Sequence, residues 1–176
     1  MALGGSLREQ LRFPRIVGGG AELLTDEAMW AALCETDLER TALRLAAVRG
    51  GASSSPTLHT RCLDVVTRWT DVLSHGEQQR LAVARLIVGA IARASTAAPR
   101  VGAGLALVLL DEATAACDLA TEALLYRAMR KWLPLAALMS VGHNASLVTF
   151  HTHHLHYVER RVGDAAPTWR LAEAKE

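Results

Sequence analysis

The sequence predicts an α/β domain in which helices cover a small parallel sheet. An uninterrupted apolar run, Leu105–Leu110, ends at two adjacent carboxylates, Asp111 and Glu112. A short apolar run of this kind is typical of a strand buried on both faces, as in a parallel sheet. A second apolar run, Leu135–Val141, also ends at polar residues. Ligands of such sheets bind beyond the carboxyl ends of the strands, so we expect the functional site there.

The size and composition fit one domain with a hydrophobic core. The chain has 176 residues and a formal net charge of +1, so no overall field draws it to nucleic acid or acidic lipid. The longest apolar stretches, Leu86–Ala92 and Val101–Leu110, are far shorter than the ~20 residues that span a bilayer. Arg8 and Glu9 interrupt any secretory pattern. The three cysteines lack C-x-x-C spacing, which indicates reduced thiols in a cytosol-like compartment.

The first third of the chain is expected to be largely helical. Capping residues and helical periodicity predict helices at Leu7–Leu11, from Thr25 or Asp26 to about Leu33, and at Asp37–Val48. Gly50–Pro56, with three consecutive serines, predicts a flexible loop. Val65-Val66 is a strand-like pair within a stretch whose role the composition leaves open.

Ser74 begins the most informative helix. Ser74 followed three residues later by Glu77 is the capping-box pattern. The buried face of this helix is expected to carry Leu81, Ala84, Val88 and Ile91. Free N–H groups, the positive end of the helix dipole, the serine hydroxyl and Gly76, which lets an anion approach closely, favour a phosphate site. An ordinary capped helix is the alternative, because capping boxes are common.

The two acids after the first strand are expected to have different roles, because neighbouring strand residues point in opposite directions. We expect Asp111 to hold Mg²⁺, directly or through water, and Glu112 to orient and polarise the water that attacks a phosphate. His143 follows the second strand, where an imidazole would touch the γ-phosphate and the attacking water. The alternative is a pair of strands that simply end in polar turns.

The remaining elements follow from local signals. Ala94–Gly104 is expected to be an insertion loop before the first strand, and Asp118 to cap a helix that ends at about Trp132. A helical turn at Asn144–Phe150 is expected to precede two edge strands, at His153–Glu159 and Thr168–Ala172. The histidines between residues 151 and 156 are expected to lie on a solvated polar strand. A metal cluster is disfavoured, because no cysteine or acid stands nearby at a matching spacing.

Taken together, these pieces resemble the nucleotide-binding domain of ATP-binding-cassette (ABC) transporters. Leu73–Arg80 resembles the signature motif, and Leu107–Glu112 resembles Walker B with the catalytic glutamate. Ala115–Asp118 resembles the D-loop, and His143 stands at the position of the switch histidine. Within the family, Ser140–His143 with Ser146-Leu147 is similar to subfamily D. That subfamily comprises peroxisomal fatty-acyl-CoA exporters, the lysosomal cobalamin transporter and related bacterial transporters.

The resemblance implies a partial P-loop NTPase of the ABC type over residues 1–176. The helical signature region would occupy about residues 20–95, and the core from Walker B to the switch histidine would occupy residues 105–160. No G-x-x-x-x-G-K-[ST] sequence occurs in the chain, so the resemblance covers only the C-terminal part of such a domain and lacks Walker A. The sequence also departs from the family at His75, where Gly is usual, and at Ala115 and Cys117.

The resemblance also implies the site, its cofactors and its partners. Two domains sandwich two ATP molecules, and the signature helix of one presses on the γ-phosphate of the ATP that the other holds. The implied residues are Glu112 and His143 for catalysis, Ser74, Gly76 and Glu77 for ATP contact, Asp118 in the D-loop and Asp111 for Mg²⁺. The implied partners are a second nucleotide-binding domain and a transmembrane domain, with no nucleic acid. The location would be the cytosolic face of a peroxisomal, lysosomal or bacterial inner membrane.

The main hypothesis is therefore an ATP-binding and ATP-hydrolysing half-domain of a transporter that binds ATP poorly by itself. One alternative is a catalytically incompetent interaction module that pairs with an intact ABC domain. A chromosome-maintenance or repair ATPase shares the signature and Walker B, but such proteins carry long coiled coils and no heptad run occurs here. We also expect an uncovered sheet edge or core face, and hence marginal solubility or dependence on a partner.

Overall fold

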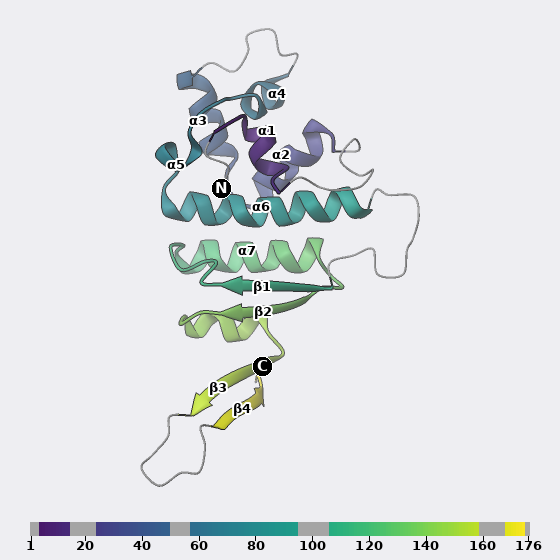
Figure 1. Ribbon diagram of the computed structural model, residues 1–176, viewed down its shortest axis with the longest axis vertical. Coiled ribbons are helices and arrows are strands. Elements are labelled where there is room, and N and C mark those ends of the chain that lie inside the picture. Colours follow the sequence, from purple (N-terminus) through teal and green to yellow (C-terminus); the bar gives the residue numbers. More distant parts are fainter. Residues whose placement is uncertain (1–3, 15–23, 50–56, 95–105, 159–167, 175–176) are drawn as a thin grey trace.

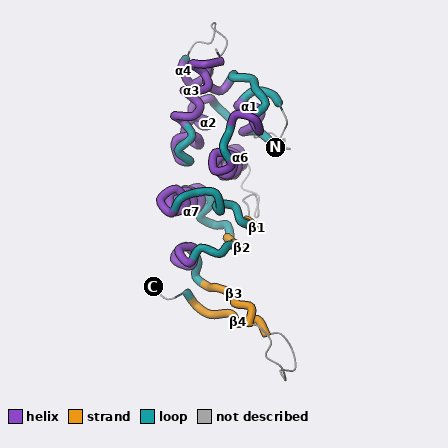
Figure 2. The backbone as a smooth tube through the Cα atoms, turned by 90° about the vertical axis from the view of Figure 1, so that its left-hand side faces the viewer, coloured by secondary structure: helices purple, strands orange, loops and turns teal. Residues whose placement is uncertain are grey.

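The structure is a computed structural model that describes residues 4–14, 24–49, 57–94, 106–158 and 168–174. The molecule is elongated, with a helical region at one end, a small sheet in the middle and a β-hairpin at the other end (Figures 1 and 2). The loop predicted at Gly50–Pro56 lies outside the described residues, as does the loop predicted at Ala94–Gly104 apart from Ala94. The described part is of the α/β class, as predicted.

Six helices precede the first strand in the described chain. They are α1 (Leu7–Leu11), α2 (Asp26–Glu35), α3 (Glu39–Arg49), α4 (Leu58–Leu63), α5 (Trp69–Val72) and α6 (His75–Ala94). Ser6 caps α1 with a capping box, and the Thr25 side chain caps α2. The three predicted helices are thus confirmed, with ends that differ by one or two residues.

Residues 57–72 differ from the strand-like expectation. Thr57 caps α4 by accepting a hydrogen bond from the amide of Thr60, and Val66 forms only an isolated bridge with Ser6. Trp69 begins α5 and is buried, and its indole N–H donates to the carbonyl of Gly5 at 2.8 Å. Trp69 thus fastens this segment beside the start of α1, and α5 begins three residues after Val66.

Helix α6 is the long helix along which the helical region is assembled (Figure 1). The predicted buried face of α6 is confirmed, because Leu81, Ala84 and Val88 are buried and Ile91 is partly buried. Arg85 on α6 donates to both the backbone carbonyl and the side-chain oxygen of Gln10 in α1, at 2.6 and 2.9 Å. Gln10 is fully buried, so this contact fixes α1 on α6.

The sheet consists of two parallel strands, β1 (Leu107–Asp111) and β2 (Ala137–Val141), joined by α7 (Leu119–Trp132). The register pairs Leu107 with Ala137 and Asp111 with Val141, so both strands end at the same edge. Asp118 caps α7, as predicted, by accepting a hydrogen bond from the amide of Thr121. A parallel pair joined by one helix is the βαβ unit.

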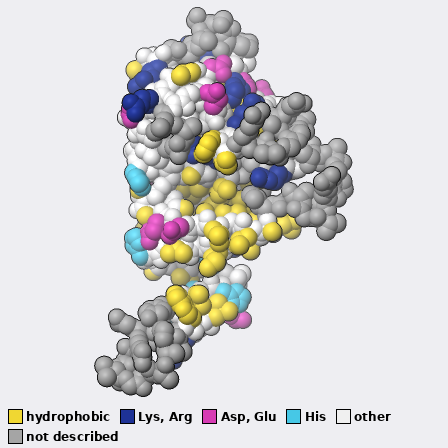
Figure 3. Space-filling model, in the orientation of Figure 1, with side chains coloured by type: hydrophobic (Ala, Val, Ile, Leu, Met, Phe, Trp, Pro, Cys, Tyr) yellow, Lys and Arg dark blue, Asp and Glu magenta, His cyan; other side chains and the backbone are white. Residues whose placement is uncertain are grey.

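The sequence predicted that β1 is buried on both faces, and this prediction is wrong. Val108 and Leu110 are buried, whereas Leu107 and Leu109 are 51% and 68% exposed. The residues paired with the exposed positions are also exposed, because α7 lies against one face and no described element covers the other. Figure 3 shows hydrophobic side chains gathered over this region. The uncovered face that the sequence analysis expected is therefore present.

Beyond the sheet, the chain forms η2, a 3₁₀ helix (Ala145–Phe150), and an antiparallel hairpin of β3 (His153–Val158) and β4 (Thr168–Glu173). The helical turn and both edge strands are thus confirmed. The His154 and His156 rings lie 4.2 Å apart, but among the described residues no group of three His, Cys, Asp or Glu side chains is placed to hold a metal. No helix in the described ranges has the length and apolarity needed to cross a bilayer.

Candidate functional site

The side chains of Glu112 and His143 meet at the carboxyl ends of the two strands. His143 Nδ1 lies 3.2 Å from Oε2 of Glu112 and 3.3 Å from Oε1. The parallel register brings the residues together, and the amide of Glu112 extends the ladder by donating to the carbonyl of Val141 at 2.9 Å. Glu112 has φ of 49°, in the left-handed region, so the chain turns sharply out of β1 at this residue. Both side chains are exposed, so a ligand has access to the pair.

Asp111 is the last residue of β1 and is also exposed. By strand alternation its side chain shares the uncovered face with Leu107 and Leu109. Mg²⁺ is commonly held by one or two carboxylates together with substrate phosphates and water. A single exposed carboxylate at a strand end fits that mode of binding, in which a nucleotide supplies the remaining oxygens.

The start of α6 is a capping box, as predicted. The amide of Ser74 donates to Oε2 of Glu77 at 2.8 Å, and the amide of Glu77 donates to Oγ of Ser74 at 3.3 Å. Ser74 is exposed, so its hydroxyl lies at the surface of the molecule. The helix start therefore presents a hydroxyl and the positive end of a 20-residue helix to solvent.

Glu77 anchors this helix start to α3. Its Oε1 accepts hydrogen bonds from Thr41 Oγ1 at 2.6 Å and from Arg44 at 3.2 Å. Burial is the largest influence and raises the pKa of Glu77, but the hydrogen bonds from Thr41 and Ser74 together outweigh it and the pKa is lowered. Both carboxylate oxygens are thus used within the protein, so Glu77 orients Ser74 in this structure.

Gly76 is needed for a close backbone approach within the chain. A Cβ atom at this residue would lie 2.8 Å from the carbonyl oxygen of Ala116. From the sequence, the missing side chain is expected to admit an anion, but in the structure the backbone carbonyl of Ala116 lies in that space. A larger residue here would push the segment between Glu112 and Asp118 away from α6.

Gln79 joins α6 to the same segment, and sequence analysis missed it. Its Nε2 donates to the carbonyl of Glu112 at 3.0 Å, and its Oε1 accepts from the amide of Ala116 at 2.9 Å. Gln79 lies within the signature-like stretch Leu73–Arg80 and stands three residues after Gly76 on the same helical face, but its partners, Glu112 and Ala116, are distant in the chain. The surface hollow beside this junction is lined by Asp37, residues 74–77, Arg80, residues 116–118 and Thr121.

The site residues predicted from the sequence therefore fall into two groups joined by Gln79. Asp111, Glu112 and His143 lie at the strand ends, and Ser74, Gly76 and Glu77 lie at the start of α6. Asp118 lies in the hollow beside the second group, and the hydrogen bond from Thr121 lowers the pKa of its carboxyl.

Glu122 is a second residue that sequence analysis missed. It lies on α7, is 1% exposed and accepts hydrogen bonds from residues that flank the Glu112–His143 pair. An acid in the first turn of a helix is ordinary at an N-terminus, so nothing in the sequence marks it as buried.

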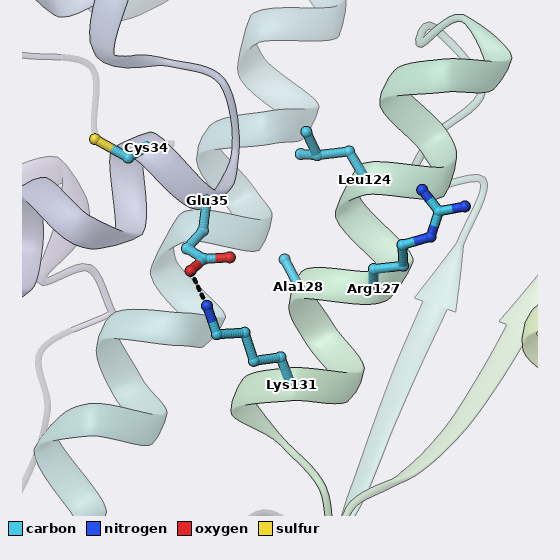
Figure 4. Close-up of a pocket in the computed structure, with 6 residues that line it drawn as sticks. All are labelled: Cys34, Glu35, Leu124, Arg127, Ala128 and Lys131. Atoms are coloured by element: carbon cyan, nitrogen blue, oxygen red, sulfur yellow. Dashed lines mark hydrogen bonds and ion pairs between the residues drawn. The ribbon is translucent and has the colours of Figure 1, made fainter.

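A separate groove lies between α2 and α7. Figure 4 shows Lys131 of α7 reaching Glu35 of α2, and their ion pair ties the helical region to the sheet region. The other lining residues are Cys34, Leu124, Arg127 and Ala128. None of the site residues predicted from the sequence lines this groove.

Comparison with known proteins gives a consistent set of relatives. No family model matches the chain. An uncharacterised ABC transporter ATP-binding protein of Synechocystis is 35% identical over 147 residues, which is 84% of this chain and 17% of that protein. A similarly described protein of Haemophilus influenzae is 41% identical over 87 residues, or 49% of this chain and 12% of that protein. The chloroplastic ABC transporter D family member 2 of Arabidopsis thaliana is 35% identical over 111 residues, or 63% and 14%.

The chain therefore spans less than a fifth of the length of each of these relatives, with shares of 17%, 12% and 14%.

Proposed function

Since this chain is related to ABC transporter ATP-binding proteins, subfamily D members among them, we propose that it is part of an ATP-hydrolysing ABC domain that drives transmembrane transport. The observation that carries the proposal is the contact between Glu112 and His143 at the ends of two adjacent parallel strands. This is the edge where ligands of parallel sheets bind.

In the proposed reaction, the carboxylate of Glu112 orients and polarises the water that attacks the terminal phosphate of ATP. His143 contacts the same water and the γ-phosphate, and its contact with Glu112 holds the carboxylate in place. Asp111 would hold Mg²⁺, which would supply positive charge beside the phosphates. The exposure of all three side chains supports this proposal, because a nucleotide has room to approach them.

The start of α6 is proposed to act on a second nucleotide. Ser74 and the free N–H groups behind it would face the γ-phosphate of an ATP held by another nucleotide-binding domain. Glu77 and Gly76 hold that helix start in place, and Asp118 lies in the adjoining D-loop. The 176 residues contain no Walker A sequence, the loop that binds the phosphates of ATP. In this proposal that loop lies outside the 176 residues, and the chain is one part of a P-loop NTPase.

The partners in this proposal are a second nucleotide-binding domain and the transmembrane domain of a transporter, at the cytosolic face of a membrane. The test combines the purified chain with an intact ABC nucleotide-binding domain and measures ATP hydrolysis. We expect weak ATP binding by the chain alone in calorimetry and a raised rate in the mixture. Glu112→Gln should lower that rate. Tight, stoichiometric ATP binding by the chain alone would contradict the proposal.

The lack of a Walker A sequence favours a second candidate, an interaction module that contributes only its signature helix to an intact partner. The same mixture separates the two. In a pure interaction module, Ser74→Ala abolishes stimulation of the partner, whereas Glu112→Gln and His143→Ala leave it unchanged. In the hydrolytic domain, all three substitutions lower the rate.

A further inference from the structure

Glu122 carries a carboxylate deep in the junction between α7, the turn after β1 and the turn after β2. Ser146 Oγ donates to its Oε1 at 2.6 Å. Thr114 Oγ1 and Asn144 Nδ2 donate to its Oε2 at 2.9 and 3.0 Å. A buried carboxylate is costly unless its oxygens are hydrogen-bonded, and here both are.

The carboxylate of Glu122 is held in its ionised form. Burial is the largest influence and raises its pKa, but the hydrogen bonds from Ser146, Asn144 and Thr114 together outweigh burial. The net pKa is below the ordinary value for a glutamate. A negative acceptor therefore persists at neutral pH, and hydrogen bonds to charged groups are stronger than those between neutral groups.

Two of the three donors lie beside the Glu112–His143 pair in the chain. Thr114 follows Glu112 by two residues, in the turn that leaves β1. Asn144 directly follows His143, in the turn that leaves β2. The two turns converge on one carboxylate, so neither can shift relative to the other without breaking a hydrogen bond to it. Thr114, Glu122 and Asn144 also line one small cavity together with Glu112 and His143.

We propose that Glu122 is a positioning residue that holds Glu112 and His143 in contact by fastening the turns that carry them. Glu122 reaches the pair through its hydrogen bonds with Thr114 and Asn144, and its charge also interacts with His143. The positioning itself needs no nucleotide. Its importance for hydrolysis rests on the proposed function.

The test reads the contact directly, from the imidazole ¹⁵N and ¹H signals of His143 in the full 176-residue chain. Glu112→Gln defines the signals of a His143 that has lost its carboxylate partner. In Glu122→Gln, a neutral amide of the same size replaces the carboxylate, so every hydrogen bond loses its charged acceptor and one of the two acceptor oxygens becomes a donor. We expect Glu122→Gln to move the His143 signals most of the way to their values in Glu112→Gln.

Two further variants keep the test decisive. Thr114→Val removes one donor and leaves Glu122 in place, so it should produce a smaller shift in the same direction. Met129→Ala, at another buried position on α7, lowers stability without touching the carboxylate and should leave the His143 signals at their wild-type values. A folded Glu122→Gln or Thr114→Val chain with wild-type His143 signals would overturn the inference.

The readout also separates this inference from the proposed function, since no ATP is present. Shifted His143 signals together with an inactive wild-type mixture would reject the hydrolytic proposal and retain the positioning role. Unchanged signals together with an active mixture would reject the positioning role alone.

Discussion

The side-chain amide of Gln79 donates a 3.0 Å hydrogen bond to the backbone carbonyl of Glu112. The same side chain accepts a 2.9 Å hydrogen bond from the amide of Ala116. One residue of α6 therefore holds both ends of the turn that follows β1. In consequence, the helix that begins at Ser74 and the carboxylate at the end of β1 cannot move independently within one chain.

The first prediction follows from this junction. Gln79→Ala removes both hydrogen bonds, and each contributes about 1 kcal/mol net, so we expect a loss of about 1–2 kcal/mol in the free energy of unfolding. The amide of Ala116 loses its acceptor, so its hydrogen exchange should accelerate. Urea unfolding and amide hydrogen exchange measure the two effects.

The control for Gln79→Ala is Gln78→Ala, which removes the same type of side chain from the preceding position. Gln78 donates to the carbonyl of Leu73, within the start of α6. This variant should leave exchange at Ala116 unchanged. Equal exchange rates at Ala116 in both variants would refute a specific role for Gln79.

The second prediction separates the structural and functional roles of Ser74. Ser74→Ala removes the cap and should cost about 1 kcal/mol in unfolding free energy. Ser74→Asp restores a capping oxygen, so stability should recover. The added negative charge would nevertheless repel a phosphate at the helix start, so Ser74→Asp should not restore the ATPase rate of the mixture described above. Recovery of both properties would assign Ser74 a capping role only.

Sequence reasoning succeeded where the determining interaction is local. The caps at Ser74 and Asp118 each involve a residue three positions away, and both are present. The two strands were predicted from their apolar runs, and their parallel pairing then places Glu112 beside His143. A site built from strand ends is accessible to sequence analysis, because the fold class fixes where the strand ends meet.

Sequence reasoning failed where the determining partner is distant in the chain. The role of Gly76 depends on Ala116, and that of Glu122 depends on Asn144 and Ser146. Trp69, the first residue of α5, is held by a hydrogen bond to Gly5, 64 positions away. The apolar run of β1 predicted burial on both faces. Hydrophobicity indicates which surface is suited to burial, but it does not indicate whether another element packs against that surface.

The third prediction concerns the uncovered face of the sheet. Leu109 is 68% exposed and its neighbour Leu110 is 6% exposed. Leu109→Thr should therefore change the unfolding free energy by no more than about 0.5 kcal/mol, whereas Leu110→Ala should cost about 2–5 kcal/mol. Removal of the exposed leucine should also reduce self-association, because exposed apolar sheet surface promotes it.

Urea unfolding and analytical ultracentrifugation of the wild type and both leucine variants test this prediction. Reduced association in Leu109→Thr at unchanged stability is the expected outcome. A large loss of stability in Leu109→Thr would show that this face is packed in solution.

The final prediction concerns acid stability and the ion pair between α1 and α2. Asp26 accepts hydrogen bonds from Arg8 and from Thr60 Oγ1, and the hydrogen bond with Arg8 is the largest influence that lowers its pKa. Because the folded-state pKa is lowered, the carboxylate stabilises the fold fully above its unfolded pKa of about 4. This contribution is lost as the pH falls through the folded value. Asp26→Asn should therefore cost about 1–2 kcal/mol at neutral pH and little in strong acid.

The control, Thr25→Ala, removes an uncharged cap from the same helix and should cost about 1 kcal/mol at every pH. Urea unfolding across the pH range measures both differences, and a loss in Asp26→Asn that stays constant with pH would rule out an ionic contribution from Asp26.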